Sequence, residues 1–381
     1  MGTPRVEIAP AVLRWATERT GLSDGDLERI FPKLEEWFEG ETQPTLRQAQ
    51  ELAQRARIPF GRLLLEEPTG ENTGIADFRT IRNSPMGKMS PDLREVVLKS
   101  QQRLAWYAEY SKAEGLVAPR LLASANLDDD PALVAKETRQ DMGFGESSIG
   151  GPDRVRNVVQ AMEDAGILVS RNSVVESSTK RKLDVEEFRG FTIEDDGYCL
   201  VYINTRDTKT AQLFSLAHEM SHVVLGKPGV SDHSDSLGLE KWCNRFASEF
   251  IAPPNQVKAA HDFGKSILEN VDYLSPRFGL SREAMLWRLV ELNLRSRDEA
   301  VSILPVLRSN ASNTQKEVGG APPYHVLVRS RVGGRFYDTV TLAAENRQIS
   351  DREAARLLTA KTYQSFKELV SARQNFGQEV D

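Results

Sequence analysis

The chain has few cysteines, no long apolar run and no excess of basic residues. Its two cysteines, Cys199 and Cys243, exclude a disulfide framework and a cysteine-rich structural zinc site, so any metal must be bound by histidine and carboxylate. No apolar run approaches the roughly 20 residues that cross a bilayer, and the N-terminus lacks the basic-then-apolar layout of a signal peptide. We therefore expect a cytoplasmic protein without membrane contact.

The charge balance is mildly acidic, with 49 basic and 55 acidic residues and a net charge of −6. Such a chain has no general attraction to nucleic acid, so binding of DNA would need a local basic patch. Hydrophobic residues make up 40% and charged residues 27%, which is typical of a globular protein. A length of 381 residues predicts two or three domains rather than a single core.

Turn-rich segments divide the chain into five parts. The stretch EEPTGENTG and residues 307–323 have the composition of linkers. Short amphipathic helices precede the first linker, whereas helices and strands alternate from about residue 120 onward. We predict a helical domain (1–68), a helical connector (69–118), a central domain (119–306), a linker (307–323) and a C-terminal segment (324–381).

The central domain is predicted to combine a small sheet with helices, which makes the chain α+β and helix-rich. A helix over 153–165 is followed by the apolar strand ILVS, and YCLVYIN (198–204) is a further strand. Helices follow at about 210–225 and 239–251.

The C-terminal segment has two β-rich runs, YHVLVRSRV and RFYDTVTLAA, on either side of Gly333-Gly334. This arrangement predicts a small β-hairpin, after which Ser350 caps a helix. No side chain there has a chemical signature, so we interpret the segment as a packing or regulatory appendage.

The motif His218-Glu219-x-x-His222 lies in the predicted helix 210–225. Histidines at i and i+4 point from one helix face, where two imidazoles can bind one Zn²⁺ at roughly 2.0 to 2.1 Å. Zinc lowers the pKa of its bound water to about 7, and Glu219 at the edge of that face can accept the proton as general base. The motif therefore predicts peptide hydrolysis without a covalent intermediate.

A chance occurrence of the motif is the alternative. The chain has only five histidines, which makes a random HExxH rare, and the surrounding residues are apolar enough to bury the helix. Burial of two histidines and a glutamate costs several kcal/mol of folding free energy unless these side chains have polar partners, and a bound metal ion is such a partner.

A catalytic zinc site usually has three protein ligands and a water, so one ligand is still needed. The carboxylates of Glu240 and Glu249 in the following helix are candidates. Asp232, His233 and Asp235 in the connecting loop compete with them, and the spacing does not choose.

Residues from about 120 to 300 resemble the ImmA/IrrE family of metallo-endopeptidases. The resemblance rests on the strand ending at Asn204, on LFSLAHEMSH, and on a helix whose pattern is Glu240-x-x-Cys243-Asn244-x-Phe246-Ala247-x-Glu249. It implies a zincin-like domain with zinc as cofactor and Glu240 as third ligand, and Glu249 as a structural acid or one that supports the ligands. Arg189-Gly190-Phe191 also resembles a family segment, which we expect to shape the site.

Other residues near the motif have open roles. Asn244, one turn from Glu240, can orient that carboxylate or a zinc-bound histidine, or it can cap local backbone. Cys243 can be a ligand, a redox group or small core filler, and we favour the last. His233 and His261 can serve as oxyanion donors or be ordinary surface histidines, so the donor stays unassigned.

Residues 10–66 resemble the Xre-type helix-turn-helix module that is often fused ahead of ImmA/IrrE peptidases, which implies DNA binding. Against it, residues 24–41 have only Arg29 and Lys33 as basic groups, and phosphates repel the acids there. We therefore favour a scaffold or protein-docking role over specific DNA recognition. The acids are Asp24, Asp26, Glu28, Glu35, Glu36, Glu39 and Glu41.

Two functions from different classes follow. The first, which the resemblance to ImmA/IrrE peptidases implies, is a regulatory zinc endopeptidase that cuts a partner repressor or antitoxin of helix-turn-helix type and so releases stress-response, mobile-element or toxin genes. The second is a non-enzymatic regulator that binds DNA or a toxin and uses zinc for structure. The presence of Glu219 favours the enzyme, because a structural site needs ligands but no general base.

Overall fold

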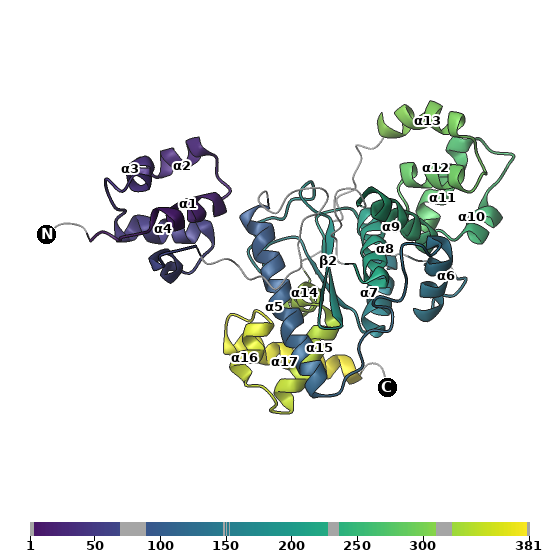
Figure 1. Cartoon of the computed structure of the whole chain (residues 1–381). Coiled ribbons are helices and arrows are strands. Elements are labelled where there is room, and N and C mark those ends of the chain that lie inside the picture. Colours follow the sequence, from purple (N-terminus) through teal and green to yellow (C-terminus); the bar gives the residue numbers. More distant parts are fainter. Residues whose placement is uncertain are drawn as a thin grey trace. The chain divides into compact units, whose positions relative to one another are not determined.

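The chain forms two compact units, residues 1–99 and 100–381, in a computed structural model (Figure 1). The structure describes residues 4–68, 89–147, 149, 151, 153–227, 236–309 and 322–378. The expected helix-rich α+β class is confirmed, because many helices accompany one three-stranded sheet. Within the described residues, no helix is both long enough and apolar enough to cross a bilayer.

Residues 10–64 of the first unit form short helices, as the sequence predicts. Thr45 and Gln48 form a reciprocal capping box that starts α4, and Ser23 caps α2 by accepting from the Asp26 N–H. Trp37 is buried at the centre of the core that the helices share. The elements are α1 (Pro10–Arg19), α2 (Asp24–Ile30), α3 (Leu34–Phe38), α4 (Leu46–Ala56) and the 3₁₀ helix η1 (Phe60–Leu64).

The second unit is built on a sheet of order β1-β3-β2. The central strand is parallel to β1 and antiparallel to β2, and all its residues are buried, as its unbroken apolar run predicts. Asp196 and Gly197, both with positive φ, form the tight turn that joins β2 to β3. The strands are β1 (Leu168–Asn172), β2 (Gly190–Asp195) and β3 (Tyr198–Asn204).

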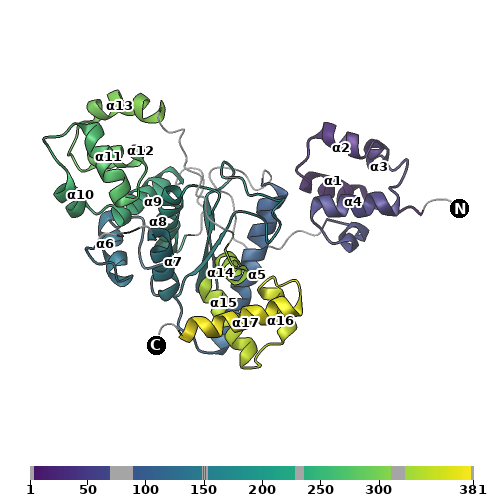
Figure 2. The ribbon, with the colours of Figure 1, turned by 180° about the vertical axis from the view of Figure 1, so that it is seen from behind.

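Helices cover both faces of this sheet. On one face, α7 (Arg154–Asp164) and α8 (Lys209–Leu225) pack against the strands around Val201 and Ile203. On the other face, α5 (Pro91–Ala113) brings Tyr107 edge-on to Tyr198. Figures 1 and 2 show the two helix layers on opposite sides of the strands.

Further helices extend the side of the sheet that carries α8. The helix α9 packs on both α8 and α6, and a buried ion pair between Glu249 and Arg288 joins it to α12. Arg139 of α6 donates to the Phe250 carbonyl near the end of α9. The helices are α6 (Pro131–Asp141), α9 (Ser236–Ile251), α10 (Pro254–Ala260), α11 (Ile267–Phe278), α12 (Arg282–Glu291) and α13 (Arg297–Ser309).

The predicted C-terminal β-hairpin is wrong, because residues 324–345 form two helices. Phe336, Val340 and Ala344 are buried at a spacing of four residues, which places them on one face of a helix, although aromatic and β-branched side chains also favour strands. Gly333, with φ of 93°, separates the two helices and lies against the Val169 backbone. The helices are α14 (Tyr324–Val332), α15 (Gly334–Glu345), α16 (Asp351–Leu357) and α17 (Tyr363–Gln378).

The C-terminal helices are joined to the rest of the unit by a buried carboxylate. Both α14 and α15 pack against β1, and Glu163 of α7 accepts from the Gly334 N–H at the start of α15. Arg335 donates to the Glu163 backbone carbonyl and to the Tyr107 hydroxyl. Burial raises the pKa of the Glu163 carboxyl to about 7, although the backbone N–H groups of Arg335 and Gly334 lower it.

This carboxyl makes the stability of the unit depend on pH. Folded Glu163 binds its proton more tightly than the unfolded chain does, so the free energy of unfolding is expected to fall as pH rises from about 4.5 to about 7. The loss amounts to about 3 kcal/mol at 1.36 kcal/mol per pKa unit. Melting temperatures between pH 5 and pH 8 should therefore fall less in Glu163→Gln than in the parent chain. Parallel falls in both proteins would contradict the prediction.

Candidate metal centre

The helix that carries the HExxH motif is fixed at both ends. Thr208 caps the start of α8 by accepting from the Ala211 N–H, and Gly226 ends it in a left-handed conformation. The last carbonyls, of Val223 and Val224, accept from backbone N–H groups of residues 123 and 125. The motif therefore sits on a rigid, buried helix.

Three potential ligands meet in one place. The metal-binding atoms of His218, His222 and Glu240 all lie within 4.8 Å of one another, and the two imidazole centroids are 5.1 Å apart. The His218 Nε2 lies 3.6 Å from a carboxylate oxygen of Glu240, which α9 brings to the site. Two imidazoles and one carboxylate are the protein donor set of many catalytic zinc sites, so these residues fit the ion that the sequence predicts.

Backbone and amide oxygens orient the two imidazoles. Asn244 places its Oδ1 3.2 Å from the Nδ1 of His218, and the Lys227 carbonyl lies 3.1 Å from the Nδ1 of His222. Since both partners are acceptors, each Nδ1 carries the proton and each Nε2 is left as the ligand atom. Burial, with the neighbouring His218, lowers the pKa of His222 to about 4, so its ring is neutral at pH 7, as a ligand must be.

Glu219 lies against the edge strand β2. Its side chain is buried, and its Oε2 accepts from the Thr192 hydroxyl at 2.8 Å. A Cβ added at Gly190 would lie 3.1 Å from the Glu219 Oε1, so this carboxylate occupies the space that a side chain there would fill. The family resemblance assigned Arg189-Gly190-Phe191 to the site, but the sequence predicted neither contact with Glu219. A glycine at this position is a signal of close approach by another group.

Glu249, the other carboxylate of α9, does not belong to this cluster. Both of its oxygens bind the buried Arg288, at 2.9 and 2.6 Å. The structure thus gives Glu249 a structural partner and brings Glu240 to the histidines. The competing loop residues Asp232, His233 and Asp235 lie outside the described residues.

Two further residues from the sequence analysis have other surroundings. Cys243 is fully buried, and burial raises the pKa of its thiol to about 12, so the group is a neutral thiol at pH 7. His261 follows α10, where its ring packs on Phe263 and its Nε2 accepts from Arg295 at 3.2 Å. Neither joins the three potential ligands.

A protein-family model matches the part of the chain that holds this cluster. Residues 162–290 match the Peptidase_M78 model, whose description is the IrrE N-terminal-like domain. The chain carries an IrrE-like domain. The match runs from the end of α7 into α12, so the IrrE-like domain includes the whole sheet, the HExxH helix and the helix that carries Glu240. This confirms the resemblance for that part of the chain. No curated protein and no solved structure matches the chain.

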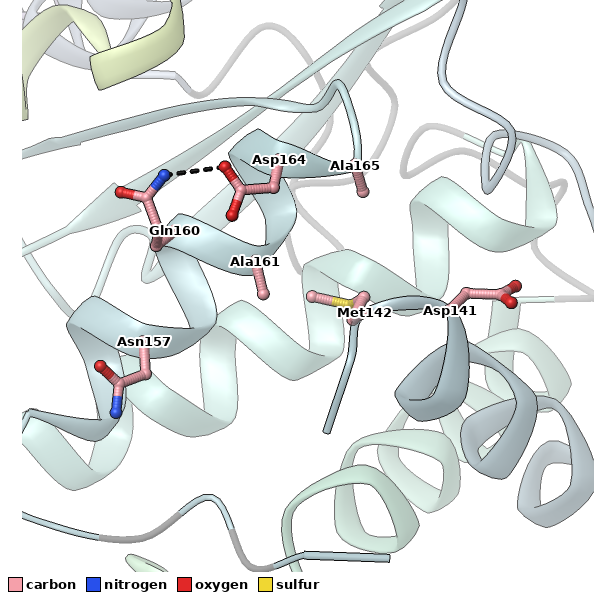
Figure 3. A pocket seen from close by; sticks show the side chains of 7 residues that line it. All are labelled: Asp141, Met142, Asn157, Gln160, Ala161, Asp164 and Ala165. Carbon is pink, nitrogen blue, oxygen red and sulfur yellow. Dashed lines mark hydrogen bonds between the residues drawn. The ribbon is translucent and has the colours of Figure 1, made fainter. Parts of the chain in front are cut away.

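A surface hollow of about 340 Å³ lies between the end of α6 and α7, and its lining includes none of the three potential ligands (Figure 3). Its lining contains Asp141 and Asp164 but neither histidine nor cysteine, and Asp164 accepts a hydrogen bond from Gln160 at 2.9 Å. The lining of the hollow therefore lacks the imidazole groups that the candidate metal centre combines with a carboxylate.

Proposed function

We propose that the IrrE-like domain is a zinc-dependent endopeptidase. The observation that carries this proposal is the position of Glu219, a buried carboxylate on the same helix as two histidines whose ligand atoms lie within 4.8 Å of the Glu240 carboxylate and of each other. When bound, zinc would supply a Lewis acid and an acidified water. His218, His222 and Glu240 would hold the ion, and Glu219 would accept the proton of the attacking water and pass it to the leaving amine.

The edge of the sheet offers a place for an extended substrate. Within the described part of the chain, β2 pairs with β3 alone. The Asn204 N–H donates to the Arg189 carbonyl, and hydrogen-bonded pairs alternate along antiparallel strands. The backbone groups of Gly190 and Thr192 therefore point away from β3. A peptide that added to this edge would run beside Glu219, because these two residues contact its carboxylate.

We propose a partner protein as the substrate, namely a helix-turn-helix repressor or antitoxin whose removal changes gene expression. The resemblance to ImmA/IrrE peptidases supports this choice. The N-terminal helices would serve as a docking module. Residues 24–41 have two basic side chains, and both are paired with acids: Arg29 with Asp26 of α2, and Lys33, which precedes α3, with Glu36. Because α3 has only five residues, neither charge nor length suits this segment to the DNA major groove.

Removal of zinc tests the proposal. The metal-stripped chain, the zinc-loaded chain and the stripped chain with zinc restored are each incubated with a proteome-derived peptide library, and new peptide ends are identified by mass spectrometry. Cuts are expected in the loaded and restored samples alone. An equal set of cuts in the stripped sample, or none in any sample, would overturn the assignment as a zinc endopeptidase.

A further inference from the structure

We propose that Thr192 is a positioning residue that fixes the orientation of the Glu219 carboxylate through its hydroxyl group. The inference rests on the proposed function, because it assigns a role in the same reaction. Thr192 lies on β2 and Glu219 on α8, 27 residues apart in the sequence, and both side chains are buried.

The hydroxyl of Thr192 has one hydrogen and two acceptors within reach. The Oε2 of Glu219 lies at 2.8 Å and the backbone carbonyl of the same residue at 3.2 Å. The shorter contact is to the carboxylate, and hydrogen bonds to charged acceptors are the stronger ones. A hydroxyl that donates to the ionised form of a buried carboxylate also replaces part of the hydration that burial removes.

Gly190 makes room for the second oxygen of the Glu219 carboxylate. It lies two residues before Thr192, so both positions face α8, because successive side chains of a strand alternate between its faces. A Cβ on Gly190 would lie 3.1 Å from both the Cγ and the Oε1 of Glu219, and 3.0 Å from the Ile203 Cδ1. Strand β2 thus binds one carboxylate oxygen and leaves space for the other.

One strand would therefore perform two tasks. Its outward backbone groups at Gly190 and Thr192 are the proposed binding edge for an extended peptide, and the side-chain face of the same residues holds the proposed general base. Because binding edge and base share two residues of one strand, the scissile bond would be aligned with the carboxylate as the peptide pairs with β2. A Thr192 that merely filled space in the core would need its shape but not its hydroxyl.

The test compares Thr192→Val, which keeps the shape, with Thr192→Ser, which keeps the hydroxyl. Full-length, zinc-loaded chains are assayed on the library peptide that the parent chain cuts fastest. We expect kcat of Thr192→Val to fall by about 10- to 100-fold with little change in KM, and Thr192→Ser to restore most of the loss. Zinc stoichiometry and the visible spectrum of the Co²⁺-substituted protein should match the parent in both variants. A crystal structure of Thr192→Val should show the Glu219 carboxylate turned from its present orientation.

The matched control is Thr341→Val, which removes another fully buried threonine hydroxyl, one that donates to the Tyr337 carbonyl within α15. Its kcat should equal that of the parent. A parent-like kcat for Thr192→Val, a fall accompanied by zinc loss, or an equal fall in Thr341→Val would overturn the positioning role while leaving the peptidase proposal intact. A parent chain that cuts no peptide would overturn both.

Discussion

Replacement of Glu219 by glutamine is expected to lower kcat by about 10²- to 10⁴-fold while the protein keeps its zinc. Glutamine has the same shape, and its amide oxygen can still accept from the Thr192 hydroxyl, so the packing against β2 should survive. It cannot accept the proton of the attacking water. The measurement is kcat on the best library peptide together with zinc content by mass spectrometry.

The control for this variant is Glu299→Gln, at the start of α13, where the carboxylate accepts from Ser296 and has no contact with the metal cluster. Its activity and zinc content should equal those of the parent. Full activity in Glu219→Gln would remove the general base from the mechanism and favour a structural role for the metal.

Replacement of Glu240 by alanine is expected to weaken zinc binding by more than about 100-fold and to leave the metal-free protein as stable as the parent. Loss of one of three ligands should lower zinc affinity at least as much as loss of a group that only orients a ligand, which lowers metal affinity 10- to 100-fold. The carboxylate side chain is about half exposed, so its removal leaves no buried cavity. Competition with a chromophoric chelator measures the affinity, and thermal unfolding of the metal-free protein measures the stability.

Glu249→Ala is the matched control, because it removes the other carboxylate of α9 and is expected to change stability rather than zinc affinity. This variant leaves Arg288 buried without its main ionic partner, which is expected to cost about 3 to 5 kcal/mol of unfolding free energy. Zinc affinity of the folded fraction should not change. If Glu240→Ala binds zinc as tightly as the parent, Glu240 is not the third ligand, and Asp232, His233 and Asp235 become the next residues to replace.

The parts of the site that could be predicted from sequence are those encoded within one helix or one strand. The spacing of His218 and His222 places both rings on one face wherever that helix lies, and the apolar run of β3 is long enough to be recognised alone. The identity of the third ligand depends on how α9 packs on α8. Sequence spacing therefore could not choose between Glu240 and Glu249, and the family resemblance was needed to select Glu240.

Contacts between distant segments could not be predicted in this way. The hydrogen bond between Thr192 and Glu219 joins a strand to a helix, and the identity of neither residue predicts this contact. The C-terminal error has a different cause. Residues 324–345 have the composition of strands, but α14 and α15 pack against β1 and bury apolar side chains four residues apart. Tertiary packing outweighs the weak intrinsic preference for strands.

The helices that cover the sheet have a consequence for any attempt to isolate the IrrE-like domain. The family match ends at residue 290, yet one face of the matched strands is shielded by residues 100–113 of α5 and by α14 and α15. A fragment cut to the limits of the match would present that apolar face to water, where exposed strands of this kind promote aggregation. The smallest fragment that folds by itself and contains the IrrE-like domain is therefore expected to be nearly as large as the entire second unit.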